Sequence, residues 1–533
     1  MASRNKYFEL FPWVGGVNNS LDPSTIPSNQ LVKAEHAVFG TRPSRKKREG
    51  ITLNWDSNVS NSAKVIGIKD FWYDDIINNA KIKRLVGVHD NGNIYSYNTA
   101  GAATLLALDG GATPWPNPVT IASFEVMNNQ LGIFVDGLGN TPKRWDGVND
   151  VFDLGGDPPD AAFARSHLGR LWTNDKNNKD RLHYCTTGNP EEWNGVGDSG
   201  ALDIGLGDGD PSGITAIFPT YKGDLFVAKK TKLYRVTGYT PETFSISLVS
   251  SGVGCISHNS IAQVDQDDMV FASERGFHSL VATANFGDFQ GAFLSRDIQD
   301  TFNNDFSKPR LPYIKGSYLS QINSVAFTIT DSALSTSYNN TVWLYNFEQK
   351  AWYSWPNIPC ESIGYSTDDD KNRWFLGGIT GRIYKTFNGL NYDISETGVN
   401  TAIRFQIKTG IIYVDDQRYL IKGFKKFSLI FNPVGVFTLT VTIKIDNYSS
   451  QSFAFTSDSG LVFLLGVSFI LGTSTLGGSL ALAPYTIGID GYGRGIQIMI
   501  EQNNVDQQVE IQGMGIEYRS AGPQQETITG ESA

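Results

Sequence analysis

Two clusters of acidic residues are the side chains whose types and spacing could carry chemistry in this sequence. They are Asp203, Asp208 and Asp210 in one stretch, and Asp265, Asp267 and Asp268 in another. Oxygen ligands on the glycine-rich DIGLGDGDP could hold calcium, but the spacing of a calcium-binding loop is absent, which favours a turn with side-chain hydrogen bonds. Carboxylates as close as those of the second cluster could serve a glycosidase, although an acidic loop is the simpler interpretation.

The histidines and cysteines form no recognisable metal motif. None of the six histidines has the HxH or HExxH spacing of zinc sites. Cys185, Cys255 and Cys360 lie far apart, which supports neither a disulfide framework nor a cysteine-rich zinc site. We therefore expect no metal, no cofactor and assembly in a reducing cytoplasm.

One short stretch resembles a catalytic motif. Gly197–Gly200 (GDSG) is similar to the nucleophile segment of trypsin-like proteases over four residues, but its flanks do not continue that motif. No stretch supplies the accompanying histidine base. We expect a glycine-rich turn at this point and no enzymatic activity.

A dense basic run ends the segment of residues 17–50, which is rich in Asn, Pro and Ser and has no sustained hydrophobic period. Its cations are Arg42, Arg45, Lys46, Lys47 and Arg48. In a chain of formal net charge −10, this density indicates either contact with phosphate or an acidic partner surface, or a solvated loop. The net charge itself excludes a basic nucleic-acid coat.

The longest apolar run is Leu461–Leu471 (LVFLLGVSFIL). It is shorter than the roughly 20 residues that span a bilayer. We expect burial or a subunit interface; the alternatives are a gate, with Leu464 and Phe469 as candidate residues, or an exposed tip that meets a membrane.

The elements that position these residues are predicted to be short strands. From about residue 60, alternating apolar runs are separated by Gly, Asn and Asp, as in RLVGVHDNGNIYSYN (84–98), where Asn91-Gly92 suits a type I′ turn. Such hairpins recur about every 48 residues, close to the length of a propeller blade. Sheets of this size must stack to bury their faces, which predicts a ring of blades. One or two large β-sandwiches are the alternative.

We therefore expect an all-β protein with three regions. Residues 1–60 are predicted to form an extended arm that contacts an adaptor or a neighbouring subunit, and residues 61–395 a β-propeller of about seven irregular blades. Residues 396–533 are predicted to form an antiparallel, sandwich-like domain. In that domain the alternation over Phe437–Ile445 places apolar side chains on one face of a strand.

Several small motifs follow one another in a recognisable order. Near the start they are Trp13–Asn18 (WVGGVN), Asp22-Pro23, Ile26-Pro27 and Arg48–Gly50; further along they are Leu233–Gly238 (LYRVTG), Phe271–Phe277 (FASERGF) and Leu294–Ile298 (LSRDI). This order resembles the tail nozzle, or tail tubular, proteins of short-tailed bacteriophages. The resemblance covers residues 1–395, and the C-terminal region carries no assigned motif.

The resemblance implies a structural protein of the virion tail. Such nozzles form a hexameric tube below the portal and its adaptor, bind tail fibres or spikes outside, and pass phage DNA through the lumen without specific binding. The acidic residues of the two clusters are then candidates to line that lumen. A bore without cations suits transit, because each cation on the wall adds a phosphate contact.

Two other functions compete with a nozzle. A tail plug that retains packaged DNA would share the propeller but close the lumen, with the run at 461–471 as its gate. A carbohydrate-binding propeller would use some of the eleven tryptophans, and it requires exposed tryptophans clustered near carboxylates.

Overall fold

The computed structural model consists mainly of β-strands and divides into two compact units. Unit 1 contains Met1–Gly50, Asn346–Trp355 and Asn388–Ala533, and unit 2 contains Ile51–Tyr345 and Pro356–Phe387. The structure describes residues 5–10, 15–40, 44–54, 59, 63–75, 78–98, 103–108, 111, 114–115, 118–264, 268–286, 293–368, 371–395, 398–432, 436–446, 450–456 and 485–522.

Unit 2 is a β-propeller whose described residues form seven sheets, here called blades 1 to 7. The first two blades are β6 (Val65–Asp75), β7 (Ala80–His89), β8 (Ile94–Tyr97) and β9 (Ala103–Leu106), then β10 (Ala122–Met127), β11 (Gln130–Val135), β12 (Lys143–Trp145) and β13 (Phe152–Asp153). The next two are β14 (Ala164–His167), β15 (Arg170–Asn174), β16 (Arg181–Tyr184) and β17 (Gly200–Asp203), then β18 (Ala216–Ile217), β19 (Leu225–Ala228), β20 (Leu233–Thr237) and β21 (Ser245–Ser250).

The later blades are less regular. Blade 5 has β22 (Ala262–Val264), β23 (Asp268–Ser273) and β24 (Gly276–Ser279); blade 6 has β25 (Lys315–Leu319), β26 (Ser324–Ile329) and β27 (Thr341–Asn346); blade 7 has β29 (Cys360–Asp368), β30 (Lys371–Gly378), β31 (Ile383–Lys385) and β5 (Thr52–Leu53). The helices of unit 2 are η1 (Pro241–Thr243), η2 (His258–Ser260), α1 (Leu280–Phe286), η3 (Arg296–Ile298), α2 (Gln299–Asn304), η4 (Lys308–Tyr313) and η5 (Ser320–Ile322). Among described residues, no helix is long and apolar enough to cross a membrane.

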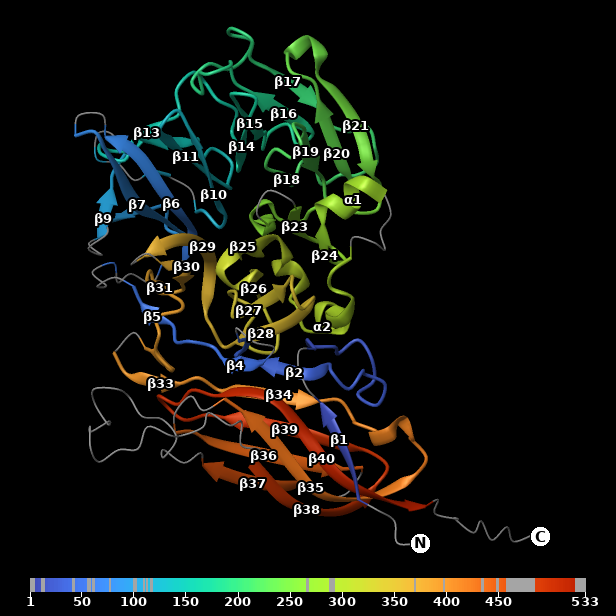
Figure 1. Ribbon diagram of the computed structural model, residues 1–533. Helices are drawn as coiled ribbons and strands as arrows, with labels where there is room; N and C mark the ends of the chain where they lie inside the picture. Colours follow the sequence, from blue (N-terminus) through green and yellow to red (C-terminus); the bar gives the residue numbers. More distant parts are fainter. Residues whose placement is uncertain are drawn as a thin grey trace. The chain divides into compact units, whose positions relative to one another are not determined.

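The blades close into a ring. Strand β6 of blade 1 contacts both β10 of blade 2 and β29 of blade 7, and β25 of blade 6 contacts β22 and β29. Figure 1 shows the sheets of unit 2 following one another in chain order around an axis. Strand β5, which precedes blade 1 in sequence, pairs with β31 and so completes blade 7. The predicted propeller of about seven blades is confirmed, and the sandwich alternative for this region is wrong.

Neighbouring blades are held together by large apolar side chains. Between blades 1 and 2, the rings of Phe71 and Trp145 lie 5.8 Å apart within a cluster of buried side chains. Burial of each such ring contributes a few kcal/mol. Gly147, two residues after Trp145, has φ +94°, and a Cβ there would lie 2.3 Å from Cδ1 of Tyr73. Only glycine fits this turn.

The hairpin predicted at residues 84–98 is present, but its turn differs from the expected type. Val88 pairs with Ile94, and the amide of His89 donates to the Asn93 carbonyl over 2.9 Å. Gly92 has a positive φ and Asn91 does not, whereas a type I′ turn needs positive φ at both central residues. The loop is therefore a three-residue connection with glycine in the left-handed position.

Unit 1 is built from two sheets. Sheet A has the order β3 (Ala37–Phe39), β4 (Arg45–Lys47), β40 (Glu510–Gly522), β35 (Ile421–Phe431) and β38 (Tyr485–Gly493), with β1 (Lys6–Leu10) also on β40. Sheet B, within this unit, has the order β28 (Ala351–Pro356), β2 (Leu31–Glu35), β34 (Phe405–Thr409), β39 (Ile496–Gln502), β36 (Thr438–Ile445) and β37 (Gln451–Thr456). A hairpin of β32 (Tyr392–Ile394) and β33 (Asn400–Ala402), and helix η6 (Val414–Asp416), complete the unit.

The two sheets of unit 1 pack their apolar faces together. Along β36, Val441 and Ile443 are buried while Lys444 is exposed, as the alternation predicts. The rings of Phe431 and Phe437 meet edge to face at 5.1 Å between the sheets. The C-terminal region therefore belongs to a β-sandwich.

The first 50 residues are not a separate arm, which corrects the expected division at residues 60, 61, 395 and 396. Strand β1 pairs with β40, β2 with β34, and β4 with β40. The physical reason is that these short segments satisfy their backbone hydrogen bonds in the sheets of unit 1, where Leu31 and Ala37 are fully buried. Unit 2 also begins earlier than expected, at Ile51, because β5 belongs to blade 7.

Ring closure can be tested at Asn54, whose amide donates to the carbonyl of Ile383 at 3.0 Å. Asn54→Pro removes this donor beside the closing strand, and we expect it to cost unit 2 about 1–3 kcal/mol and to lower its melting temperature by several degrees. Asn54→Ala is the matched control, because it keeps the amide and the side-chain nitrogen of Asn54 has no hydrogen-bond partner. Thermal unfolding followed by tryptophan fluorescence measures both variants; equal melting temperatures would argue against a stabilising seam.

Candidate functional site

The basic cluster at residues 42–48 is largely interior. The side chains of Arg45, Lys47 and Arg48 are at most 1% exposed, and Lys46 is half-buried. Arg42 lies outside the described residues. The structure contradicts the predicted partner contact for the three buried residues, because a side chain enclosed by its own chain cannot reach another molecule.

Arg48 forms the most complete set of contacts in this cluster. Its Nη1 and Nη2 atoms donate to the two carboxylate oxygens of Asp393 at 2.7 and 2.6 Å, and Nε donates to Nδ1 of His36 at 2.9 Å. The guanidinium also lies 5.6 Å from the ring centroid of Trp355. A two-pronged, planar contact of this kind fixes β4 against the β32–β33 hairpin within unit 1.

Lys47 and Arg45 are held by neutral acceptors. Lys47 Nζ donates to Oε1 of Gln502 at 2.7 Å and to the Gln507 carbonyl at 2.9 Å. Burial, reinforced by the nearby charge of Arg48, lowers the pKa of Lys47 to about 8. Arg45 donates to the Gly15 carbonyl and burial lowers its pKa to about 9. The cluster therefore organises the interior of unit 1.

The first acidic cluster is engaged in structural contacts of blades 3 and 4. Asp203, at the end of β17, is exposed and pairs with Arg181 at 2.9 Å. Asp208 lies 3.2 Å from the buried ammonium of Lys229. Asp210 accepts hydrogen bonds from the backbone and hydroxyl of Ser212 at 2.9 and 2.6 Å. The predicted turn with side-chain hydrogen bonds is present; a place in a lumen stays a prediction.

The second acidic cluster and the gate candidates are described only at Asp268. Its Oδ2 accepts from Ser279 Oγ at 2.6 Å and its Oδ1 from the Val281 amide at 3.0 Å, which ties β23 to the start of α1. Four of the predicted residues lie outside the described part of the chain: Asp265, Asp267, Leu464 and Phe469.

The GDSG stretch is a turn, as expected. Asp198 accepts hydrogen bonds from the backbone and hydroxyl of Thr187 at 2.8 and 2.7 Å and pairs with Arg170. The hydroxyl of Ser199 accepts from the Gly195 amide at 3.0 Å. Within the described ranges, no group of three or more His, Cys, Asp or Glu side chains could hold a metal ion.

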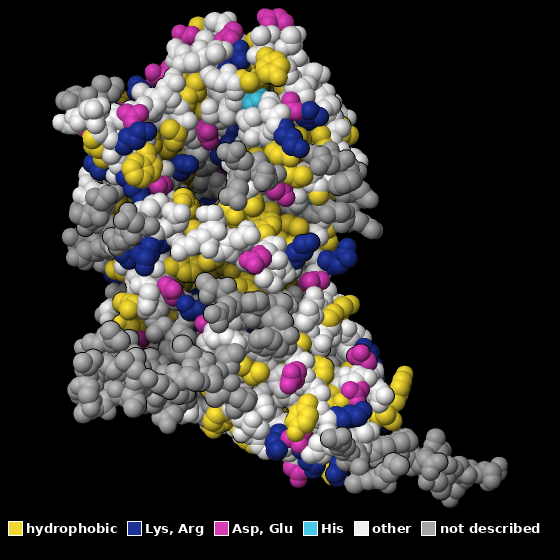
Figure 2. All heavy atoms as spheres, viewed as in Figure 1, with side chains coloured by type: hydrophobic (Ala, Val, Ile, Leu, Met, Phe, Trp, Pro, Cys, Tyr) yellow, Lys and Arg dark blue, Asp and Glu magenta, His cyan; other side chains and the backbone are white. Residues whose placement is uncertain are grey.

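Charges of both signs are mixed over the visible surface. In Figure 2 the Lys and Arg side chains alternate with Asp and Glu side chains over the described part of this face. Alternating signs cancel one another beyond about 8 Å at physiological salt. This face therefore presents no broad field of one sign in its described part.

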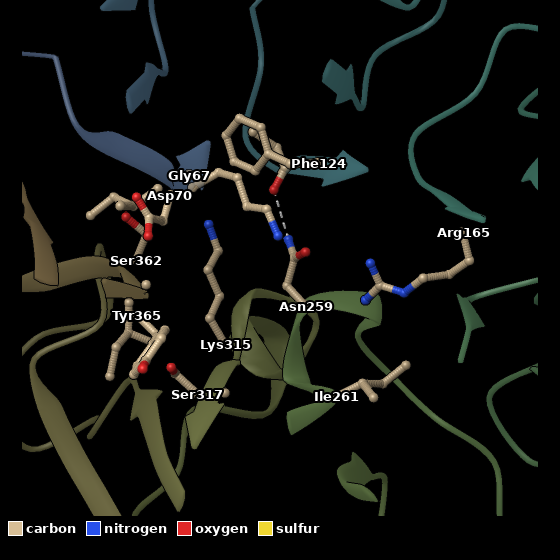
Figure 3. Close-up of a pocket in the computed structure, with 16 residues that line it drawn as sticks. Gly67, Asp70, Phe124, Arg165, Asn259, Ile261, Lys315, Ser317, Ser362 and Tyr365 are labelled. Carbon is tan, nitrogen blue, oxygen red and sulfur yellow. Dashed lines mark hydrogen bonds between the residues drawn. The ribbon is translucent and has the colours of Figure 1, made fainter. Parts of the chain in front are cut away.

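A charged cavity of about 370 Å³ lies among the first strands of several blades of unit 2, on the propeller axis. It is lined by residues of β6, β10, β14, β25 and β29, which begin their blades: Gly67–Asp70, Ala122, Phe124, Arg165, Asn259, Ile261, Lys315–Ser317 and Ser362–Tyr365. Figure 3 shows the side chains of Lys315 and Arg165 directed toward its interior from different strands. Asn259 Nδ2 donates to the Ala122 carbonyl at 2.9 Å and so links two sides of the wall.

The cavity lining is positively charged. Lys69, Arg165 and Lys315 face it together with a single acid, Asp70. Burial lowers the pKa of Lys315 to about 8, with Glu361 acting in the opposite direction. Burial also lowers the pKa of Lys69 and raises that of Asp70. At neutral pH, Lys315 is still protonated at this pKa.

The motifs and composition of the sequence did not identify these cavity residues. Lys69 lies within the apolar run VIGIKDFW and Lys315 directly follows Ile314, so each looks like a strand residue of unremarkable charge. The signal that could have found them is their spacing, because Lys69, Arg165 and Lys315 are separated by roughly two and three blade lengths. Residues at equivalent blade positions meet at the axis.

The comparisons with known proteins concern the fold. No family model matches the chain, and no curated protein matches it. Among solved structures, U3-55K is similar with a TM-score of 0.38 and 9% identity over 64% of this chain and 99% of that chain. The WD40 β-propeller domain of Doa1 gives 0.37 and 10% over 62% and 97%, and Sqt1 of Saccharomyces cerevisiae gives 0.38 and 9% over 64% and 98%. The propeller assignment rests on the seven sheets and their ring of contacts.

The interior role of the basic cluster predicts different effects for two neighbouring cations. Arg48→Ala leaves Asp393 without its guanidinium, and we expect it to destabilise unit 1 by about 3 kcal/mol. Lys46→Ala is the control, because Lys46 is one-third exposed and lies 3.8 Å from Glu49, and we expect a change below about 0.5 kcal/mol. Urea unfolding measures both; similar midpoints for the two variants would contradict a structural role of Arg48.

The acid contacts of blade 4 predict a pH dependence. Burial alone would raise the pKa of Asp210, but hydrogen bonds from Ser212 and Thr231 outweigh it and hold the pKa at about 2. A carboxyl whose pKa is depressed on folding stabilises the protein above its unfolded pKa, so this contribution, about 2 kcal/mol, is lost as the pH falls from about 4 to 2.

We expect Asp210→Asn to lower the stability of unit 2 at pH 7. We also expect this variant to lose less stability than the parent protein as the pH falls over that acid range. Asp203→Asn is the control, since its exposed pair with Arg181 contributes less than about 1 kcal/mol. Thermal unfolding from pH 7 to pH 2 measures both. If Asp210→Asn and the parent protein lost stability in parallel, Asp210 would not carry the effect.

Proposed function

We propose that this protein is a structural subunit of a bacteriophage tail nozzle, in which six copies form a tube for DNA ejection. The tube would lie below the portal and its adaptor, bear tail fibres or spikes, and pass DNA without specific binding. Assembly would take place in the host cytoplasm and the finished protein would reside in the virion tail. In this proposal the protein catalyses no reaction.

The observation that carries the proposal is the placement of the motifs that resemble nozzle proteins. LYRVTG contributes β20 of blade 4, FASERGF forms most of the β23–β24 hairpin of blade 5, and LSRDI leads into η3. Motifs that follow one another in sequence thus become consecutive blades of the ring. This supports the view that the resemblance reflects a shared blade order.

The described tryptophans give little support to a carbohydrate-binding propeller. Eight of the nine described tryptophans are buried in the core, and Trp72 is the exposed one, at 51%. Its indole nitrogen already donates to Asp70 at 3.0 Å. A sugar-stacking surface needs several exposed rings side by side, which the described tryptophans do not supply.

The tail-plug alternative depends on residues 461–471, which lie outside the described part of the chain. A nozzle and a plug differ in whether the assembled ring is open along its axis. The mixed surface charges in Figure 2 and the formal net charge of −10 fit a channel that holds DNA weakly. On these grounds we favour the nozzle.

Oligomeric state and ring shape test this proposal. We expect the purified full-length protein, at rising concentration, to give a species with six times the mass of one chain by mass photometry, and an open ring by negative-stain electron microscopy. Duplex DNA at physiological salt should show no stable retention in a mobility-shift assay, because few phosphate contacts are offered. A ring closed at its centre would favour the plug, and a monomer at every concentration that binds polysaccharide would favour the carbohydrate-binding propeller.

A further inference from the structure

The axial cavity of the propeller gathers cations that lie far apart in the sequence. Lys69 comes from β6, Arg165 from β14 and Lys315 from β25. Three blades therefore each contribute a positive side chain to the lining of one cavity. Like charges brought together repel one another, so this arrangement favours either an anion that compensates them or the loss of a proton from a lysine.

Lys69 has no such compensation within the described residues. None of their hydrogen bonds or ion pairs within 4 Å involves its ammonium group, although Glu125 and Asp70 act on it from further away. Arg165 pairs with Glu125 through Nη1 at 3.2 Å, but its Nε is buried without a hydrogen-bond partner. Lys69 is thus the cation of the lining whose ammonium group contacts no partner among the described residues.

The nearby acids already have other partners. Glu125 also accepts from the amide of Ser166 at 3.1 Å. Asp70 accepts from the Trp72 indole at 3.0 Å and lies 3.9 Å from the ammonium of Lys83. Neither carboxylate forms an ion pair with Lys69 within 4 Å, although Asp70 Oδ1 has no hydrogen-bond partner of its own.

Other buried cations of the same propeller show what compensation looks like. Lys229 is fully buried, and it lies 2.7 Å from Asp180 and 3.2 Å from Asp208. Buried charges in proteins are in general paired or bound to a ligand. Lys69 is only half-buried, and its ammonium group has no such partner beside the open volume of the cavity.

We propose that the axial cavity binds a small oxyanion of the phosphate class, with Lys69 and Arg165 as its principal ligands and Lys315 completing the positive wall. The lining carries three basic side chains and one acidic side chain, a composition that favours an anionic ligand over a neutral one. The volume of about 370 Å³ is at the small end of ligand sites. It suits inorganic phosphate or a small phosphate monoester, and it is independent of any role in a phage tail.

The roles of the three cations differ. Lys315 also donates to the Ile66 carbonyl, so it supports the wall of the cavity as well as its charge. Arg165 lines the cavity while its Nη1 atom is paired with Glu125, and a planar guanidinium suits a tetrahedral oxyanion. Among the three cations, Lys69 makes the fewest contacts in the protein without a ligand. Replacing Lys69 should therefore change anion binding with the least effect on folding.

Isothermal titration calorimetry on the full-length protein tests the site, with inorganic phosphate and glycerol phosphate as separate probes at constant ionic strength set with chloride. We expect saturable binding of inorganic phosphate, and binding of glycerol phosphate shows whether the site also accepts an ester. Lys69→Met should weaken phosphate binding at least about tenfold, the loss of one charge-assisted hydrogen bond. Lys81→Met is the control, because Lys81 is an exposed lysine of the same blade, 75% accessible, and should bind as the parent does.

Melting temperatures without phosphate separate a ligand residue from a structural one. We expect Lys69→Met, and equally Lys69→Gln if the first variant does not fold, to melt no lower than the parent, because the half-buried ammonium group that is removed makes no hydrogen bond or ion pair among the described residues. Phosphate should raise the melting temperature of the parent and of Lys81→Met only. Absence of saturable phosphate binding by the parent, or equal binding by the parent and the Lys69 variant, would overturn the proposal.

Discussion

The structure depends on one constraint: a ring of small sheets buries the faces of its blades only when its first and last sheets meet, and it leaves only short edges at the outer strands. Here β6 contacts β29, and the short strand β5 pairs with β31 to finish blade 7. The closing strand comes from residues that precede blade 1. Strand β5 hydrogen-bonds into blade 7, and β6, the next strand along the chain, hydrogen-bonds into blade 1. Consecutive strands therefore stabilise the two sides of the seam.

That seam also shapes unit 1. Strand β5 is the first strand of unit 2. The residues before it therefore belong to unit 1, and the residues directly after it continue into blade 1 of unit 2. Unit 1 consequently takes strands from both ends of the chain: Tyr7 of β1 pairs with Glu517 of β40, and Glu35 of β2 with Gln406 of β34. Sheets built from distant segments hold the first 50 residues in place, which explains why they have no hydrophobic period of their own.

The sequence predicted those features that arise from local patterns. Alternation in β36, hairpins such as β7–β8 and the blade repeat all depend on neighbours within about 50 residues, and they are present. The location of the first 50 residues depends on pairings hundreds of residues away, and local composition does not encode such partners. A turn between apolar runs was predictable near Gly92, whereas its type depends on whether Asn91 also adopts positive φ.

The charges in the sequence predicted the surroundings of a side chain least well, again because its partners lie far away along the chain. The run from Arg45 to Arg48 looked exposed to a partner or to solvent, because cations usually are exposed. Instead, Lys47 at the end of β4 and Arg48 directly after it contact Gln502 and Asp393 from distant segments of the chain. Conversely, Lys69 and Lys315 look like ordinary strand residues in the sequence, and only their spacing in blade lengths connects them. The number and spacing of cations are visible in a sequence, but their acceptors are not.

The distinction between a structural cation and a ligand-binding one follows from these acceptors. Arg48 and Lys229 find carboxylates on neighbouring segments, so their burial stabilises the fold only when both partners are present. Lys69 occupies the axis, where inner strands diverge and leave a volume that side chains do not fill. Glu125 and Asp70 act on this cation only from a distance, and in the proposed complex an anion from solution supplies the direct contact.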